Sequence, residues 1–502
     1  MTSVEEPQTG SAAEDFAAVL RYRMRAYGGE PFAEVGGRWL TGEDLTGYVD
    51  RLNTLIAGAG VAENAAIGVV MRNRFPHAAA ILAFVSENRS FSMIYCQQSP
   101  EAIGADIERL GLALVVADPE DWTPAVVDAA RRQGSVGIAI GADRDHVTLV
   151  PGLERLGAGP FGEVIDQHGV AVLTSGTTGP PKRLHIRVPV LERAAASASP
   201  GVAVSADEPP DLVFWPFGGI GGLCQLLGAV RAGKRLVLLE RFTVPEWVSA
   251  IKRHQITRVG VQPTVIRMIL DANVPKEDLA SLKMLHGGSG PLDPGTRDRF
   301  EEVYGIPVLW AYGATEFAGT LIAWTPELYR EYGAAKRASS GRPVPGSEVR
   351  VVDPVTGTEV PPGEEGVLEA RIPLIEPDWI RTTDLASIDE DGFVTLHGRG
   401  DGAIIRGGFK VLPEVVRSAL VAHPAVLDAV VVGLPDRRLG ELVAAVVELA
   451  SGVEPLTEDA LREWLRDRLP YQQVPARIKI VDRLPRTPSL KVSFEAARKL
   501  FA

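Results

Sequence analysis

The chain has 502 residues, of which 45% are hydrophobic and 23% charged, so it can bury a large core and is too long for one ordinary domain. Its formal charge of −12 argues against nucleic-acid or anionic-membrane binding, so an anionic substrate must meet a local positive site. The two cysteines, Cys96 and Cys224, exclude a disulfide framework and are expected to be core thiols in a reducing compartment. The polar N-terminus and the lack of any apolar run of about 18 residues predict a soluble cytoplasmic protein without membrane insertion.

In chain order, a helical pattern runs from Asp15 to Tyr27, and short apolar runs then alternate with segments of helical length. The predicted helices include 76–88 and a segment ending at Ala232, and the predicted strands are 65–71, 91–95, 113–118, 212–216, 235–240, 256–261, 283–288 and 307–313. This alternation predicts an α/β fold of mostly parallel sheets covered by helices. Sites in such sheets lie beyond the carboxyl ends of the strands.

The pattern changes after about residue 340. Strands with Gly and Pro turns predict a small antiparallel region or barrel. A run rich in glycine and charge follows at 397–408, and the rest of the chain reads as a compact α+β segment. The sequence therefore predicts a small second domain, with a hinge near 399–402.

The strongest local motif is LTSGTTGPPKR at 173–183, which follows an apolar run. It combines hydroxyl donors, glycines that let backbone amides approach an anion, and a cation, which together suit a polyphosphate. These residues are Ser175, Thr177 and Thr178, then Gly176 and Gly179, and Lys182. The spacing differs from that of the G-x-x-x-x-G-K-[ST] loop. A surface turn rich in Ser, Thr and Gly is the alternative reading.

A second motif, WAYGATEFAG, spans residues 310–319. Tyr312 supplies a flat ring, Gly313 a turn, Thr315 a hydroxyl and Glu316 a carboxylate. An aromatic face beside a hydroxyl and a carboxylate suits a purine nucleotide with its Mg²⁺. A strand end with a packed tyrosine and a solvated glutamate is the alternative.

Two later motifs carry further candidates. Within RTTDLASIDEDGFVTLHGRGD, Asp384 could accept hydrogen bonds from sugar hydroxyls, and Arg399 could support a ribose or a phosphate. Lys491 follows the turn PRTPS near the C-terminus. Taken alone, such a lysine is a solvated side chain.

Together, TSGTTGPPK, YGATE, RTTD with GRGD, and PRTPSLK occur in an order and at a spacing that resemble the acyl-adenylate-forming superfamily. This superfamily contains acyl- and aryl-CoA ligases, peptide-synthetase adenylation domains and beetle luciferases. The resemblance spans nearly the whole chain and is greatest to stand-alone CoA ligases. It implies an N-terminal domain, 1–399, that binds ATP and the acid, and a mobile C-terminal domain, 400–502, with a site between them.

The resemblance also implies a role for each matching residue. The loop from Thr174 to Lys182 would hold the β- and γ-phosphates, Thr315 the α-phosphate and Glu316 the Mg²⁺. Tyr312 would stack on adenine, opposite a wall formed by Gly288, Ser289 and Gly290. Asp384 and Arg399 would hold the ribose, and Lys491 would bridge the acid and the α-phosphate. Asp401 matches the hinge, and the pantetheine path of coenzyme A would follow Gly407, Gly408 and Lys410.

The expected acyl pocket is lined by Trp215, Phe217, Gly218, Gly219 and Gly313. The segment WPFGGIGG has Gly218 where relatives commonly have a gating histidine. With further glycines at 219, 221 and 222, the missing side chains predict a roomy pocket for a bulky, apolar aromatic or polycyclic acid. The alternative is that other side chains refill the volume.

Other departures from the family pattern leave the activity open. Arg183 replaces the usual glycine after Lys182, Thr383 stands in IRTTD, PEVVR lacks both usual glutamates, and Leu490 precedes Lys491. The first reading is an AMP-forming acid–thiol ligase that uses ATP, Mg²⁺ and coenzyme A on a small carboxylic acid. The second is an adenylating enzyme that passes acyl-AMP to an acyl-carrier protein or partner ligase. A luciferase-type oxygenase and a non-catalytic nucleotide-binding relative are less favoured.

Overall fold

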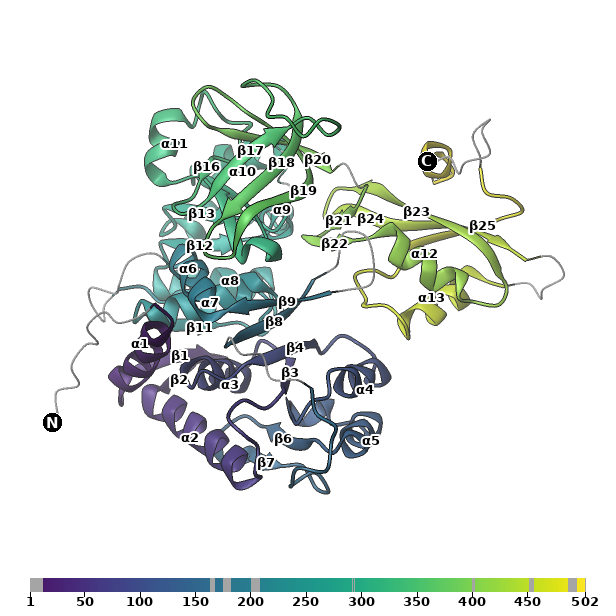
Figure 1. The fold of residues 1–502 in the computed structure, drawn as a ribbon. Helices are drawn as coiled ribbons and strands as arrows, with labels where there is room; N and C mark the ends of the chain where they lie inside the picture. Colours follow the sequence, from purple (N-terminus) through teal and green to yellow (C-terminus); the bar gives the residue numbers. More distant parts are fainter. Residues whose placement is uncertain are drawn as a thin grey trace.

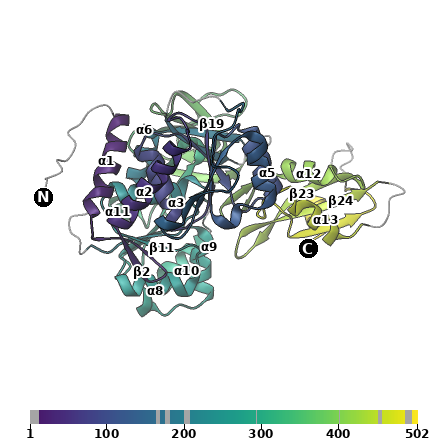
Figure 2. The ribbon, with the colours of Figure 1, turned by 90° about the horizontal axis from the view of Figure 1, so that it is seen from below.

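The computed structural model describes residues 12–162, 168–174, 182–199, 208–290, 292, 294–399, 402–450, 456–485 and 494–501, with the backbone alone at 12–15, 173–174, 182, 398–399, 414 and 494–495. A large domain is followed, from residue 402, by a smaller one beside it (Figure 1). The view from below shows the smaller domain extending to one side (Figure 2).

A seven-stranded sheet is the largest layer, with the order β7-β6-β5-β3-β4-β8-β9. The strands from β6 to β8 run parallel, whereas β7 and β9 are antiparallel edges. Its strands are β3 (Ile67–Met71), β4 (Phe91–Tyr95), β5 (Leu114–Ala117), β6 (Val136–Ile140), β7 (Val147–Leu149), β8 (Gly169–Thr174) and β9 (Lys182–Arg187). Its helices are α2 (Gly42–Gly58), α3 (Phe75–Ser86), α4 (Pro100–Arg109), α5 (Pro124–Gln133) and α6 (Val188–Ala198), with short turns η1 (Pro119–Asp121) and η2 (Arg144–His146).

Two further sheets complete the core of the large domain. One has the order β12-β13-β14-β15-β16, and its first three strands are parallel. The other has the order β10-β11-β1-β2. Their strands are β1 (Pro31–Val35), β2 (Arg38–Thr41), β10 (Asp211–Val213), β11 (Leu236–Leu238), β12 (Arg258–Val261), β13 (Met284–Gly287), β14 (Val308–Ala314), β15 (Gly319–Ala323) and β16 (Arg342–Pro343). Their helices are α1 (Ala12–Tyr27), α7 (Ile220–Arg231), α8 (Val244–His254), α9 (Pro263–Asp271), α10 (Pro294–Tyr304), η3 (Lys276–Leu279) and η4 (Thr315–Phe317).

The apolar segments of helical length in the sequence form helices that are buried in the large domain. All residues of α3 are buried, and so are residues 222–230 of α7 except Gln225. A helix that is apolar all round must lie inside the protein. Helix α6 contacts both β8 and β15, and α7 contacts both β10 and β15, so these two helices link the sheets (Figure 1).

The region after residue 340 is antiparallel, as predicted. It is a four-stranded sheet of β17 (Glu348–Val352), β18 (Gly366–Ile372), β19 (Glu376–Ile388) and β20 (Val394–Arg399), preceded by α11 (Pro326–Tyr332). Its core includes Leu368, Ala386 and Val394, which pack with Phe317 of the turn η4. The sheet is thus joined to the carboxyl end of β14.

The C-terminal domain is a second α+β unit. Its sheet has the order β22-β21-β24-β23, and β25 adds to β24 in parallel. Its elements are β21 (Ile404–Arg406), β22 (Phe409–Val411), α12 (Pro413–Val421), β23 (Val426–Asp436), β24 (Gly440–Leu449), α13 (Glu458–Arg466), β25 (Arg477–Val481) and α14 (Phe494–Lys499). It contacts the large domain where Arg267 of α9 donates from Nη1 to the carbonyl of Arg438, at 3.1 Å.

Most predicted elements agree with the structure to within two residues, but two details differ. The strand predicted at 212–216 ends at Val213, because Pro216 lacks an N–H group and the chain turns there toward α7. Cys224 is buried as expected, whereas Cys96 is only half-buried, and both cysteines are free. Among the described residues, no helix is both long and apolar enough to cross a bilayer.

Candidate active site

The motif at 310–319 forms a tight turn at the carboxyl end of β14. A Cβ atom on Gly313 would lie 2.0 Å from the carbonyl oxygen of Gly319, so only glycine allows β14 and β15 to approach this closely. Gly319 has a φ of +118°, in the region that favours glycine. Buried Phe317 anchors the turn. Between these fixed points, Thr315 and Glu316 are both half-exposed.

The structure brings Tyr312 and Asp384 together. The Tyr312 hydroxyl donates to Oδ2 of Asp384 at 2.5 Å, across 72 residues of sequence. Asp384 lies in β19, and the Thr382 hydroxyl accepts a hydrogen bond from its backbone N–H at 3.0 Å. The backbone of Arg399 in β20 is the register partner of Asp384. Two motifs assigned to adenine and ribose are therefore adjacent.

The loop after β13 lies against the same strand. A Cβ atom on Gly288 would lie 2.8 Å from the carbonyl oxygen of Ala311 in β14. The carbonyl of Gly290 accepts a hydrogen bond from the Trp310 indole at 3.1 Å. Ser289 has a φ of +69°, an unusual value for a residue other than glycine. This strained backbone is held by its neighbours on β14.

The C-terminal domain reaches this loop through the turn between β21 and β22. A Cβ atom on Gly290 would lie 3.3 Å from Cα of Gly408, and one on Gly408 would lie 3.0 Å from the carbonyl oxygen of Ser289. Gly407 and Gly408 have φ values of +57° and +87°, which favour glycine. Lys410 pairs with Ile405 across the hairpin. The residues predicted for the coenzyme A path thus adjoin the predicted adenine wall.

The phosphate-loop motif connects the ends of two neighbouring strands. Thr174 at the end of β8 pairs in register with Lys182 at the start of β9. Ser175, Gly176, Thr177, Thr178 and Gly179 lie outside the described residues, as do Asp401 and Lys491. The roles predicted for these seven residues, and for the side chains of Thr174, Lys182 and Arg399, stay predictions.

Arg183, which replaces a glycine of the family pattern, anchors the base of this loop. Its Nη2 contacts Oδ2 of Asp106 in α4 at 2.7 Å, and both side chains are nearly buried. Arg109 contacts the other oxygen of Asp106 at 2.5 Å. Burial raises the pKa of Asp106, but the hydrogen bonds from Arg183 and Arg109 outweigh it and hold that pKa below its ordinary value.

Asn73 holds the segment predicted to line the acyl pocket. It follows β3 and is buried. Its Nδ2 donates to the carbonyl of Trp215 at 2.7 Å, and its Oδ1 accepts from the N–H of Phe217, also at 2.7 Å. The Trp215 indole donates to the carbonyl of Gly260 at 3.0 Å. One amide therefore satisfies two backbone groups of a segment that belongs to no strand or helix.

The expectation that the glycines of WPFGGIGG leave open volume is wrong at three of the four positions. A Cβ atom on Gly218 would lie 3.0 Å from two carbons of the Tyr95 ring. At Gly221 it would lie 2.4 Å from the Trp215 ring, and at Gly222 2.2 Å from the carbonyl oxygen of Pro216. Gly219 alone has open space, with no atom closer than 3.7 Å. Neighbouring rings and backbone occupy the missing volume.

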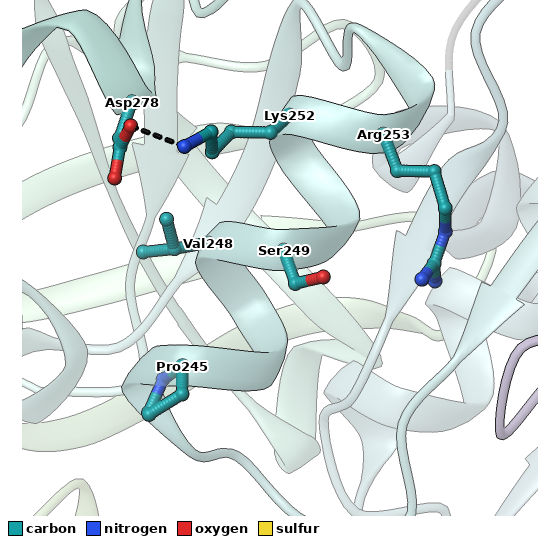
Figure 3. Close-up of a pocket in the computed structure, with 6 residues that line it drawn as sticks. All are labelled: Pro245, Val248, Ser249, Lys252, Arg253 and Asp278. Atoms are coloured by element: carbon teal, nitrogen blue, oxygen red, sulfur yellow. Dashed lines mark hydrogen bonds and ion pairs between the residues drawn. The ribbon is translucent and has the colours of Figure 1, made fainter.

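A surface hollow is lined by residues of α8 and by Asp278 of η3 (Figure 3). None of the predicted site residues lines it, and its lining is Pro245, Val248, Ser249, Lys252, Arg253 and Asp278. Lys252 contacts Asp278 at 2.5 Å, and Arg253 contacts Glu34. Both cations are thus paired with carboxylates, which makes this hollow a weaker candidate for an anionic ligand than the motif residues.

Glu316 suits a metal ion that also binds substrate phosphates. Among the described residues its carboxylate makes no hydrogen bond and no ion pair. No cluster of three or more His, Cys, Asp or Glu side chains occurs in the described part of the chain. Mg²⁺ commonly takes one or two carboxylates and completes its shell with phosphate and water oxygens. A single carboxylate without a partner among the described residues is consistent with that mode.

Sequence reasoning missed four residues of this region: Asn73, Tyr95, Gln225 and His286. Asn73 and Tyr95 lie at the carboxyl ends of neighbouring parallel strands, where sites are expected. Gln225 and His286 are polar residues within otherwise apolar elements. These two signals were available in the sequence, although neither identifies a partner.

The fold is that of a two-domain α/β protein, and the candidate residues gather at the ends of its strands. The family model "AMP-binding enzyme" matches residues 20–375, and "AMP-binding enzyme C-terminal domain" matches 416–491. The chain therefore belongs to the AMP-binding enzymes, and it is an AMP-forming ligase, as its motifs predict.

Similar proteins include ligases with different acceptors. A fatty acid–[acyl-carrier-protein] ligase, ScoC of Streptomyces coeruleorubidus, is 32% identical over 65% of this chain and 66% of its own length, just under two thirds. A 2-succinylbenzoate–CoA ligase of Bacillus subtilis is 28% identical over 65% of this chain and 68% of its own. The structure of the amide bond synthetase McbA from Marinactinospora thermotolerans has a TM-score of 0.80 and 27% identity, and covers 96% of this chain and 99% of its own.

Proposed function

We propose that this enzyme activates a ring-bearing carboxylic acid with ATP and transfers the acyl group to coenzyme A. The observation that carries the proposal is the hydrogen bond between the Tyr312 hydroxyl and the Asp384 carboxylate. It joins two distant motifs whose predicted roles are to bind adenine and ribose. The loop at Gly288–Gly290, beside β14, and the turn of Thr315 and Glu316, at the end of β14, would supply further groups for the nucleotide.

In the first step, a carboxylate oxygen of the acid attacks the α-phosphorus of ATP, and the bond to pyrophosphate breaks. The product is a mixed anhydride with AMP. In the second step, a thiol loses its proton and attacks the carbonyl carbon, and AMP leaves. Negative charge grows on phosphoryl oxygens in the first step, so fixed donors and cations stabilise its transition state.

The residues of this chain divide that work. The hydroxyls and amides of 174–182, with Lys182, would hold the β- and γ-phosphates, and Thr315 would contact the α-phosphate. Lys491 would place a positive charge between the acid and the phosphorus. Mg²⁺ held by Glu316 would neutralise phosphate charge. Asp384, oriented by Tyr312, would accept hydrogen bonds from the ribose hydroxyls.

A ring-bearing acid is supported by the aryl substrate named for the B. subtilis relative. The glycine-rich segment no longer supports a large pocket by itself, because Tyr95 and Trp215 fill most of the space. We therefore propose an aromatic or polycyclic acid of a size that fits beside Gly219 and Gly313, rather than the bulkiest acids.

A second candidate differs only in the acceptor. The likeness to the amide bond synthetase covers almost the whole chain, and the ScoC relative acts with an acyl-carrier protein. The loss of both glutamates in PEVVR and the Leu490–Lys491 pair lie in the domain that completes the second step. In this case an amine or a carrier-protein thiol would take the acyl group from acyl-AMP.

The test measures pyrophosphate and AMP release separately with a panel of ring-bearing and linear acids. Release of both, together with acyl-CoA formation, supports the first candidate. Acyl transfer only when an amine or a carrier protein replaces coenzyme A supports the second. Absence of pyrophosphate with every acid refutes both.

Glu316→Gln should raise the Mg²⁺ concentration for half-maximal activity, whereas Glu302→Gln, on the exposed face of α10, should not.

A further inference from the structure

Two polar side chains of the large domain, Gln225 and His286, are half-buried next to fully buried residues. Gln225 is half-buried within α7, whose neighbouring residues from 222 to 230 are all buried. His286 is likewise half-buried in β13, between buried Leu285 and Gly287. Neither polar side chain is therefore fully buried by the surrounding packing.

The two side chains converge on one point. A Cβ atom on Gly260 of β12 would lie 3.0 Å from Nε2 of Gln225 and 3.1 Å from Nε2 of His286. Oε1 of Gln225 accepts a long hydrogen bond from the N–H of Trp215, at 3.4 Å, which directs its NH₂ group toward Gly260. Trp215 is in turn fixed by the hydrogen bonds of its carbonyl to Asn73 and of its indole to Gly260. The convergence is therefore preorganised.

The strand register puts His286 on the same face of the sheet as Gly313, a residue of the predicted acyl pocket. His286 is the partner of Leu309 in β14, and Gly287 is the partner of Trp310. Successive residues of a strand alternate between faces, so His286 shares a face with Gly313, and Trp310 shares the other with Tyr312. The predicted adenine ring and the His286–Gln225 pair thus lie on opposite faces of β13 and β14.

The chemistry of the pair is that of neutral donors. The pKa of His286 is lowered to about 4, chiefly by burial and also by Arg258 and Lys234 against the opposing charge of Asp211, so the ring is uncharged near neutral pH. A neutral imidazole has one donor and one acceptor nitrogen, and the glutamine amide has two N–H donors. No hydrogen bond of the His286 ring is formed within the described part of the chain.

We propose that His286 and Gln225 select an acid that carries an oxygen acceptor, a keto or hydroxyl group, on its ring. The proposal rests on the proposed function and adds to it the class of ring substituent. A site built to bond a polar group rejects an analogue that lacks it, because its own buried donors are then left unpaired. Nε2 of Gln225 and Nε2 of His286, which both lie beside Gly260, would donate hydrogen bonds to that oxygen.

The experiment compares matched acids that differ only in this oxygen, 4-hydroxycinnamic with cinnamic acid and 3-(4-oxocyclohexyl)propanoic with 3-cyclohexylpropanoic acid. The ratio of kcat/KM within each pair is measured by ATP–pyrophosphate exchange. The wild type should prefer the oxygenated acid of at least one pair by about tenfold or more. His286→Leu and Gln225→Leu should each bring that ratio toward one while retaining activity on the plain acid. Gly260→Ala, which places a methyl group between the two nitrogens, should also lower it.

His168→Leu, at an exposed histidine, is the control and should leave the ratio unchanged. The proposal would be overturned if the wild type shows no preference in either pair of acids. It would also be overturned if the preference survives in both leucine variants. If no acid supports exchange, the proposed function fails. The role of His286 and Gln225 is then judged by the thermal shift that each acid produces in the protein. A shift that is specific to the oxygenated acid and is lost in His286→Leu supports the role, whereas equal shifts with both acids refute it.

Discussion

Replacing Asn73 by alanine tests whether one buried amide holds the acyl side of the site. The side chain donates to the carbonyl of Trp215 and accepts from the N–H of Phe217, both at 2.7 Å. Phe217 is fully buried, so its N–H has no ready access to water. The substitution removes both partners of this segment at once.

The expected cost follows from those two contacts. Leaving a buried donor or acceptor unpaired costs about 1–3 kcal/mol, so the free energy of unfolding should fall by about 2–6 kcal/mol for the two groups together. Water that enters the vacated space would bring the loss toward the lower value. The segment should also become mobile, because no strand or helix holds residues 214–219.

Urea unfolding measures the stability, and steady-state kinetics with the acid and ATP varied in turn measure the site. Asn73→Ala should raise KM for the acid by about tenfold, since a loss of about 1.4 kcal/mol in binding is a tenfold effect, and leave KM for ATP nearly unchanged. The matched control is Asn53→Ala, because Oδ1 of Asn53 has no hydrogen-bond partner among the described residues. A loss of stability below about 0.5 kcal/mol, or equal changes in both KM values, would refute the reasoning.

Three other substitutions test separate parts of the structure. Gly218→Ala places a methyl group 3.0 Å from the Tyr95 ring and should cost about 1–3 kcal/mol, whereas the same substitution in a Tyr95→Ala background should cost much less; additive losses in urea unfolding would contradict the contact. The pKa of Asp106 is lower in the folded state than in the unfolded state. The Asp106 carboxylate therefore stabilises the folded protein above the unfolded pKa of about 4, and this stabilisation is lost as the pH falls through the folded pKa. Asp106→Asn should therefore unfold at neutral pH more easily than the wild type and depend less on pH below about 4, as circular dichroism would show. Lys491→Ala should slow adenylation by about 10²–10³-fold, with less effect on thioester formation from supplied acyl-AMP, and equal losses would argue against its assigned role.

Several parts of the fold follow from local pattern and were predictable. The alternation of short apolar runs with helical segments predicts parallel strands such as β3, β4 and β5, because strands buried on both faces read as continuous apolar runs. The turn around Thr315 and Glu316 was also predictable as a site element, since its residue types occur directly after a strand. Order and spacing of the motifs were sufficient to predict the family.

Other features depend on contacts between residues far apart in the chain. Tyr95 fills the space beside Gly218, and Asn73 bonds a segment 142 residues away. A glycine in a sequence shows only that its own side chain is missing, whereas its neighbours in space determine whether that volume is open. The sequence by itself determined the fold class and the nucleotide motifs, because these depend on local periodicity and residue chemistry. Only the tertiary structure decided the packing and polarity of the predicted acyl side, because β3, β4, β12, β13 and α7 meet there from separate parts of the chain.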